Sequence, residues 1–164
     1  MKIIYTNKGQ EIFVDDEDYE DLTKHTWFIS KKGYAVRNVA HPTEKGKWVI
    51  EGMHRRIMGL EYGNTLKVDH RDHCKVNNQR INLRVCTNSQ NLFNRGANRN
   101  NTSGFKGVNQ DKNSGRWVAE IWKNGKKKSL GHFDTAESAH EAYCKAAIEI
   151  HGEFANFGDA KKAA

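Results

Sequence analysis

The sequence predicts an α+β protein made of two small domains, and three observations lead to that prediction. Its 164 residues are 37% hydrophobic, which suits two small cores better than one large core. Residues 105–133 alternate between apolar and polar side chains, as strands do, and a helical pattern follows them. Residues 66–94 read instead as strand, polar loop, strand and helix. We therefore expect one domain in each half of the chain.

The N-terminal half begins with two strand-like segments, KIIY and EIFV, around the turn TNKGQ, where Asn7 and Gly9 can adopt positive φ. The acidic segment DDEDYEDLTKH is expected to form a short helix, since acids in the first turn interact favourably with the helix dipole. A hairpin around residues 31–33, a strand at KWVIEG and a short helix at MHRRIMGL complete this part. Its expected core residues are Trp27, Phe28, Ile29, Trp48, Ile57 and Met58.

The middle of the chain, VDHRDHCKVNNQRINLRVCTNSQN, concentrates His, Asp, Asn and Cys residues. The segments LKVDH and LRVCT are strand-like, and a polar loop joins them. Thr87 is a good N-cap for a helix over NSQNLFNR. Residues 94–103 have no apolar periodicity, so we expect a linker whose Arg95 and Arg99 can follow phosphates.

The C-terminal half predicts three antiparallel strands packed under one helix. The strands are FKGVNQ, RWVAEIW and KKSLGHF, separated by turns at DKNSG and KNGK. The helix is expected to begin at the N-cap Thr135 and to end at the C-cap Gly152. One face of this helix carries small and apolar residues, at Ala139, Ala142, Tyr143, Ala146, Ala147 and Ile150.

The net charge of +7 is unevenly distributed, because residues 1–22 carry −5 and the remainder carries +12. A positive body suits a polyanionic partner, although ordinary solubilising charge gives a similar balance. The three cysteines form no C-x-x-C pair, so we expect no disulfide framework and a reduced, cytoplasmic setting. The sequence has no signal-peptide pattern and no apolar run long enough for a membrane span, so no membrane partner is expected.

The polar middle segment admits three readings. Structural zinc requires paired Cys and His spacings, which this segment does not provide. A loop-fixing role suits several of its Asn and Asp residues but does not explain His70 and Asn91. Hydrolytic chemistry is the third reading: Asp69 and Asn91 supply oxygen ligands of the kind that Mg²⁺ prefers. His70 can take a proton from water near neutral pH.

The same segment resembles the HNH nuclease motif of phage homing endonucleases, with D-H-x-D, N-N, N-L-R-x-x-T and a final N in the family's spacing. The upstream MHRRIMG resembles the segment that precedes this motif in the family. The resemblance implies a ββα-metal (His-Me finger) HNH nuclease domain over residues 1–93. It makes His70 the general base, while Asn82 braces the loop and orients that histidine. Asp69 and Asn91 would hold Mg²⁺ or Mn²⁺. The family's common Gly-Asn is replaced by His73-Cys74.

Residues 104–158 resemble the plant ethylene-response-factor (Apetala-two) DNA-binding domain in KGV, WVAEI, LGHFDTAESAHEAY and HGEFANF. The resemblance implies a three-stranded sheet that lies in the DNA major groove. Several arginines of that family are replaced here, so its base preference does not carry over. The expected DNA contacts of the whole chain are Arg55, Arg56, Arg84, Arg95, Arg99, Lys106, Asn109, Arg116, Glu120, Trp122, Lys127 and Ser129.

Together these patterns predict a site-specific DNA endonuclease of the phage homing type, acting on double-stranded DNA in the host cytoplasm. One divalent metal and the histidine base would hydrolyse the phosphodiester bond. One site per chain favours nicking by a monomer, or cleavage of both strands through a weak homodimer. The alternative is a non-catalytic transcriptional regulator that binds DNA through the C-terminal sheet. A restriction role stays open, and a role on RNA is disfavoured because no RNA-recognition stacking motif is present.

Overall fold

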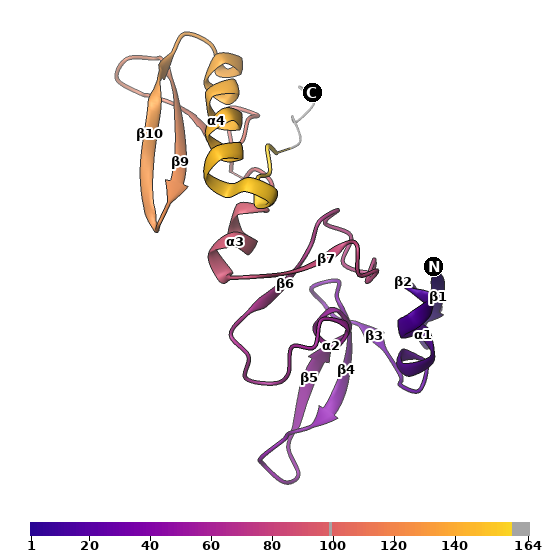
Figure 1. The fold of residues 1–164 in the computed structure, drawn as a ribbon. Helices are drawn as coiled ribbons and strands as arrows, with labels where there is room; N and C mark the ends of the chain where they lie inside the picture. The colour runs from indigo at the N-terminus through magenta and orange to yellow at the C-terminus, as the bar shows by residue number, and fades with distance from the viewer. Residues whose placement is uncertain (99, 159–164) are drawn as a thin grey trace. The chain divides into compact units, whose positions relative to one another are not determined.

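The computed structural model describes residues 1–98 and 100–158, and its course is shown in Figure 1. The chain divides into two compact units, Met1–Asn88 and a second unit that begins at Ser89. The division therefore lies closer to the N-terminus than the expected linker at residues 94–103. Among the described residues, no helix combines the length and apolarity that crossing a bilayer requires.

The first unit contains three small antiparallel sheets and two short helices. The order of the hairpins and helices follows the predicted one, although β3 is only two residues long. Strand pairing joins β1 to β2, β3 to β4 to β5, and β6 to β7. The elements are β1 (Lys2–Tyr5), β2 (Glu11–Val14), α1 (Asp16–Leu22), β3 (Phe28–Ile29), β4 (Ala35–Ala40), β5 (Trp48–Gly52), α2 (Met53–Ile57), β6 (Lys67–His70) and β7 (Leu83–Cys86).

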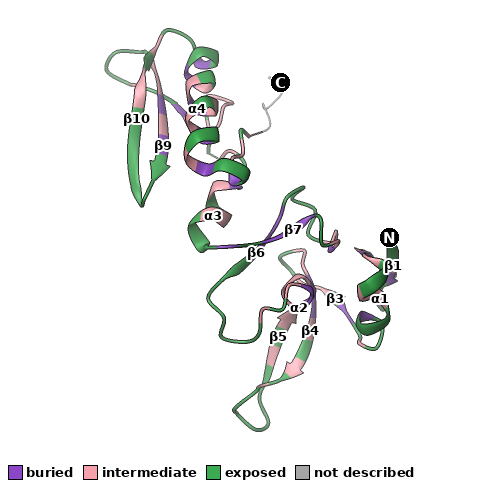
Figure 2. Cartoon of the chain, viewed as in Figure 1, coloured by how far each residue is buried: buried purple, intermediate pink, exposed green. Residues whose placement is uncertain are grey.

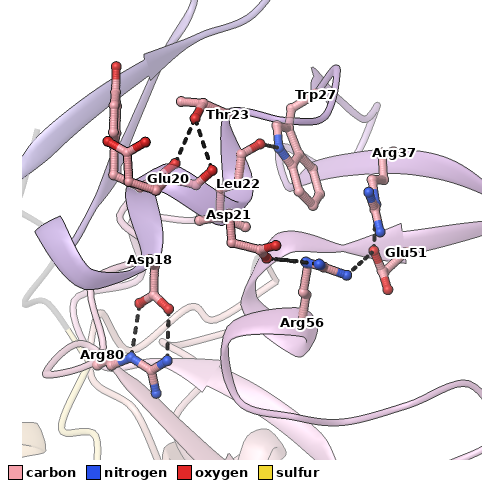
Figure 3. A network of polar contacts seen from close by, with 11 residues as sticks. Asp18, Glu20, Asp21, Leu22, Thr23, Trp27, Arg37, Glu51, Arg56 and Arg80 are labelled. Carbon is pink, nitrogen blue, oxygen red and sulfur yellow. Dashed lines mark hydrogen bonds and ion pairs between the residues drawn. The ribbon is translucent and has the colours of Figure 1, made fainter.

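The core of the first unit gathers apolar residues from each of these sheets and from both helices. Trp27 is buried there, and its indole N–H donates a 2.8 Å hydrogen bond to the Leu22 carbonyl at the end of α1 (Figure 3). This bond satisfies the one polar group of a large buried ring. Ile57 is also buried, and Ile29 and Met58 pack against the same cluster, as predicted.

Two residues expected in this core, Phe28 and Trp48, lie on the surface instead. Phe28 is 40% exposed and Trp48 is 70% exposed. Phe28 pairs with Val36 and Trp48 pairs with Ala40, and alternation along β4 puts these pairs on one face of the sheet. The core prediction was wrong for both residues because that face does not turn to the core.

The second unit has a three-stranded antiparallel sheet, in the order β10–β9–β8, packed on one long helix. The predicted strand number and helix are confirmed, and Figure 1 shows α4 beside β9 and β10. A register shift between Ser129 and Gly131 marks a bulge in β10. The elements are α3 (Asn88–Phe93), β8 (Val108–Gln110), β9 (Trp117–Lys123), β10 (Lys126–Phe133), α4 (Ala136–His151) and the 3₁₀ helix η1 (Gly152–Phe154).

The ends and the packed face of α4 agree with the sequence. The Thr135 hydroxyl accepts a 3.1 Å bond from the Ser138 N–H, and Gly152 closes the helix with a positive φ of 53°. Ala139, Tyr143 and Ala147 are buried, and Figure 2 shows buried and exposed positions alternating along the helix. The small alanines let the helix lie close to the sheet.

Candidate active site

Asp69 and His70 are the last two residues of β6, and both side chains are buried. Pairing with β7 sets Asp69 opposite Arg84. The Arg84 guanidinium donates to Asp69 Oδ2 from Nη2 at 2.7 Å and from Nε at 2.9 Å. A buried carboxylate needs such a partner, because its own desolvation is expensive. Arg84, an expected DNA contact, is thus held inside the first unit.

Asn82 fixes the polar loop that separates β6 from β7. Its side-chain amide donates to Asp72 Oδ1 at 2.9 Å and to the Asn77 carbonyl at 2.8 Å. Its Oδ1 accepts from the Asp72 N–H at 3.0 Å, and its carbonyl accepts from the N–H of Arg71, the residue after His70. The loop that follows His70 is therefore closed by Asn82.

Asp72 is the second fixed point of this loop. Partial burial would raise the pKa of its carboxyl, but hydrogen bonds from Asn77, the Cys74 N–H and Asn82 outweigh it, and the pKa lies below its usual value. The carboxylate is therefore ionised at neutral pH and accepts from all three groups.

The acidic helix α1 anchors the same loop. The Arg80 guanidinium pairs with Asp18 at 2.7 Å and with Glu17 at 2.7 Å, and Figure 3 shows the Asp18 pair. Asp15 accepts from the Arg80 N–H at 2.7 Å and from the Gln79 side chain at 3.1 Å. Several carboxylates of residues 1–22 thus pair with groups of the first unit's own loop.

His70 belongs to a cluster of rings with His54 and Tyr34. The ring centroids of His54 and His70 are 5.3 Å apart, and Tyr34 lies 5.1 Å from His54 and 5.8 Å from His70. Gly52 makes room for this packing, since a Cβ there would lie 2.7 Å from His54 Cε1. The resemblance of MHRRIMG to the segment before the motif is the signal in the sequence for His54, but from the sequence alone no choice is made between a His54 that faces the site and one that only flanks a short helix.

Both histidines of the cluster favour the neutral form. Burial, followed by the charges of His70 and Arg55, lowers the pKa of His54 to about 3. Burial also lowers the pKa of His70, although a hydrogen bond with Asn78 and the charges of Asp72 and Asp69 act in the opposite direction. A neutral imidazole at neutral pH is the form that a general base requires.

The two arginines of α2, both expected to contact phosphate, have partners within the first unit. Arg55 donates to the carbonyls of Leu66, Glu61 and Asn64 and so holds the loop before β6. Arg56 pairs with Asp21 at 2.8 Å and approaches Glu51 at 3.9 Å (Figure 3). Contact of either guanidinium with DNA remains a prediction.

The remaining His and Cys residues of the motif occupy different settings. Cys86 is buried on β7, and burial raises the pKa of its thiol. Cys74 and His73 are exposed, and His73 has a positive φ of 63°. Glycine adopts such a conformation easily. The resemblance gives the family a glycine there, and this backbone geometry is a physical reason for it.

The predicted metal ligands are distributed over both units. Asp69 lies on β6 of the first unit, and Asn91 lies on α3 beyond the division at Ser89. Within residues 1–98 and 100–158, no group of three or more His, Cys, Asp or Glu side chains is placed to hold a metal ion. The predicted ligands, Asp69 and Asn91, are one carboxylate and one amide. They therefore do not form such a group of three, and their metal binding remains a prediction.

Five of the expected DNA contacts share the outer face of the second unit's sheet: Asn109, Glu120, Trp122, Lys127 and Ser129. Glu120 Oε2 accepts from Asn109 Nδ2 at 3.0 Å and from Lys127 Nζ at 2.8 Å, which links all three strands. Trp122, opposite Lys127, is 55% exposed. This face offers amide, cationic and aromatic groups together.

The other contacts expected from this half have different positions. Arg116 pairs with Asp134 at 3.1 Å, and Arg95 is exposed. Lys106 is turned inward, where its Nζ donates to the Phe93 carbonyl at 2.7 Å and burial lowers its pKa to about 8. Arg99 lies outside the described residues.

Residues at both ends of the expected linker make contacts within the second unit. Asn94 is buried, and the Asn101 side chain donates to the Phe105 carbonyl at 2.7 Å. Next to them, the Phe93 ring stacks on His151 with centroids 3.8 Å apart. The assignment of residues 94–103 as a linker remains a prediction.

Comparison with known proteins finds a relative that matches most of the chain and a known domain in its C-terminal half. The chain is 33% identical over 152 residues to an uncharacterized HNH endonuclease, L560, of Acanthamoeba polyphaga mimivirus, covering 90% of this chain and 74% of that relative. The chain belongs to the HNH endonuclease family. Within this HNH protein, residues 103–153 match the AP2 domain. Both family resemblances drawn from the sequence are thereby confirmed.

Two further relatives show how the similarity is distributed along the HNH protein. Protein 3.8 of Escherichia phage T7 is 31% identical over 90 residues, covering 55% of this chain and 74% of that protein. APETALA2-like protein 2 of Oryza sativa is 44% identical over 54 residues, covering 33% of this chain but only 12% of the plant protein. The similarity to this plant protein is therefore limited to about a third of the chain. No solved structure matches the chain.

Proposed function

We propose that this HNH protein is a metal-dependent DNA endonuclease that uses His70 as its general base. The observation that carries the proposal is a buried, neutral histidine at the end of β6, directly after Asp69, in a chain of the HNH family. The loop bracing by Asn82 supports the proposal, because it fixes the backbone that follows the histidine.

In this proposal the His70 imidazole takes a proton from a water molecule, and the water oxygen attacks the phosphorus of the scissile phosphate. The bond to the leaving oxygen breaks, and that oxygen recovers a proton from solvent. Burial favours the neutral imidazole before the step, while the neighbouring carboxylates of Asp69 and Asp72 stabilise the imidazolium that forms.

The metal assignment is part of the proposal. Asp69 and Asn91 would hold Mg²⁺ or Mn²⁺, because a carboxylate and an amide are hard oxygen donors of the type that these ions take. The buried Asp69 carboxylate fits such a role, with Arg84 fixing its Oδ2. When bound, the ion would stabilise negative charge on the phosphate and on the leaving oxygen.

We infer that the second unit supplies DNA affinity and position through its sheet. The match to the AP2 domain and the outer-face network around Glu120 support this inference. A homing-type action on a specific site is proposed on the same basis, with viral and phage relatives in support. A ββα-metal arrangement of β6, β7 and α3 belongs to the same proposal.

The test is cleavage of supercoiled plasmid by the full chain with Mg²⁺, Mn²⁺ or EDTA. We expect metal-dependent open-circular product, which is lost in His70→Ala and retained in the matched variant His73→Ala, since His73 is exposed in the same loop. Linear product would indicate paired cuts. If the folded wild-type chain cuts no plasmid with either metal but still binds duplex DNA, the nuclease proposal fails and the regulator alternative is favoured.

A further inference from the structure

One face of the first unit carries apolar side chains that its core does not use. It belongs to the sheet β3–β4–β5, where Trp48 is 70% exposed, Ile50 is 65% exposed and Phe28 is 40% exposed. At one end of this face Phe28, Tyr34 and Ile50 line a groove of about 580 Å³. Contiguous exposed apolar surfaces of this kind commonly mark binding sites for ligands or other macromolecules.

The charged side chains around the groove are cationic, which favours an anionic ligand. Its lining includes Lys31, Lys32 and Arg55, and among the described residues it includes no carboxylate. A fourth cation, Lys75, stands over the Tyr34 ring at 4.8 Å and donates to the Lys32 carbonyl at 2.8 Å. The nearby Glu51 belongs to the opposite face, where it pairs with Arg37. An apolar floor with a cationic rim suits a nucleotide, which combines an apolar ring with an anionic phosphate.

The groove also leads to the candidate base. His54 is one of its lining residues, and the centroids of the His54 and His70 rings are 5.3 Å apart. Tyr34 contacts both the groove and His70. His54 and Tyr34 therefore connect the groove to the candidate base.

We propose that this groove binds one unstacked nucleotide of the DNA strand that is cut. The base lies against Phe28, Tyr34 and Ile50, and Lys31 and Lys32 contact the flanking phosphates. The volume lies within the range of small-ligand sites, which is about 300–1,000 Å³. The position beside the scissile phosphate rests on the proposed nuclease function, whereas nucleotide binding itself does not.

The test measures binding of the full chain in EDTA, so that cleavage plays no part. The probes are a fluorescein-labelled single strand of thymidines and a labelled random-sequence duplex, both followed by anisotropy. We expect Phe28→Ser/Ile50→Ser to weaken single-strand binding by about tenfold, since loss of base stacking costs between about fivefold and a hundredfold. Duplex affinity is expected to stay within about twofold, because the second unit's sheet supplies it.

The matched control is Ile148→Ser, which removes an isoleucine of similar exposure (59%) from α4. It should leave both affinities unchanged. Equal single-strand binding by wild type and double variant overturns the proposal, as does an equal loss for both probes. A wild-type dimer that becomes a monomer in Phe28→Ser/Ile50→Ser, measured by sedimentation, also overturns it and assigns the face to a second copy. Plasmid cleavage is scored separately, so the nuclease proposal and the groove proposal fail on different readouts.

Discussion

At each of the acidic residues near His70, the side chain has partners within the first unit. Asp69 is neutralised by Arg84, and Asp72 is surrounded by three hydrogen-bond donors. Removing one partner of a buried ion pair leaves the other charge uncompensated. The Asp69–Arg84 pair before the histidine and the hydrogen bonds to Asp72 after it therefore hold the backbone on both sides of His70, which is what a proton-transferring group needs.

His54 makes the stability of the protein depend on pH. Its pKa is held at about 3, against about 6.5 in an unfolded chain, so the unfolded state takes up a proton that folded His54 does not. This contribution is fully present above pH 6.5 and is lost as the pH falls towards 3. Between pH 7 and pH 5 we expect it to lower the free energy of unfolding by about 2 kcal/mol. Urea unfolding at both pH values measures this loss.

The comparison for this prediction is His54→Phe, whose free energy of unfolding should fall by about 2 kcal/mol less over the same interval. His25 and His70 also have lowered pKa values, so part of the pH dependence remains in the variant. The exposed His132 provides the control, since His132→Phe should keep the wild-type dependence. Equal pH dependence in wild type and His54→Phe would show that burial in the ring cluster does not lower the pKa of His54.

At the element scale, the polar loop between β6 and β7 is held by side chains and not by a core of its own. Asn82→Ala removes two donors and one acceptor from Asp72 and Asn77. We expect a loss of about 2–3 kcal/mol in the free energy of unfolding, because partly buried polar groups are left unpaired. Hydrogen exchange of the Asp72 amide should quicken, because that N–H loses its acceptor.

The control for the loop is Asn113→Ala, in an exposed turn where the backbone N–H of Asn113, and among the described residues not its side chain, makes a hydrogen bond, to Asp111 Oδ1. That variant should change the free energy of unfolding by less than about 0.5 kcal/mol. An Asn82→Ala protein with wild-type stability and wild-type exchange at Asp72 would show that the loop does not depend on this side chain.

Elements with strict alternation or clear caps were predictable from the sequence, and those that depend on tertiary pairing were not. The three strands and the helix of the second unit follow from period and capping at Thr135 and Gly152. Alternation does not say which face of β3–β4–β5 turns to the core, so Phe28 and Trp48 were misplaced. His70 and Asp69 were found from their motif, but the partners Arg84 and His54 come from pairing across strands and from ring packing.

Over the whole molecule, some charged side chains form ion pairs within a unit and others are exposed to solvent. Glu17 and Asp18 of the acidic N-terminal region bind Arg80 of the first unit, so these carboxylates are used internally. The sheet of the second unit instead presents exposed Lys127 next to Trp122. DNA affinity that depends on this face should carry the salt dependence of phosphate contacts.

Lys127→Ala tests that division of charge. We expect duplex affinity to fall by about threefold to tenfold and the slope of log affinity against log salt to decrease by about 1. Lys145→Ala removes the same charge from an exposed position on α4 and should change neither quantity by as much. Equal effects of the two variants would indicate attraction by net charge alone, without a contact at the sheet.

The role of His70 as the general base is tested most directly by rescue of His70→Gly with added imidazole in the plasmid assay with Mg²⁺. The variant should be inactive alone and should recover nicking in proportion to imidazole, because the free base occupies the space of the lost ring. His73→Gly should need no imidazole. A folded His70→Gly protein that nicks at the wild-type rate without imidazole would contradict the role of His70 as the base.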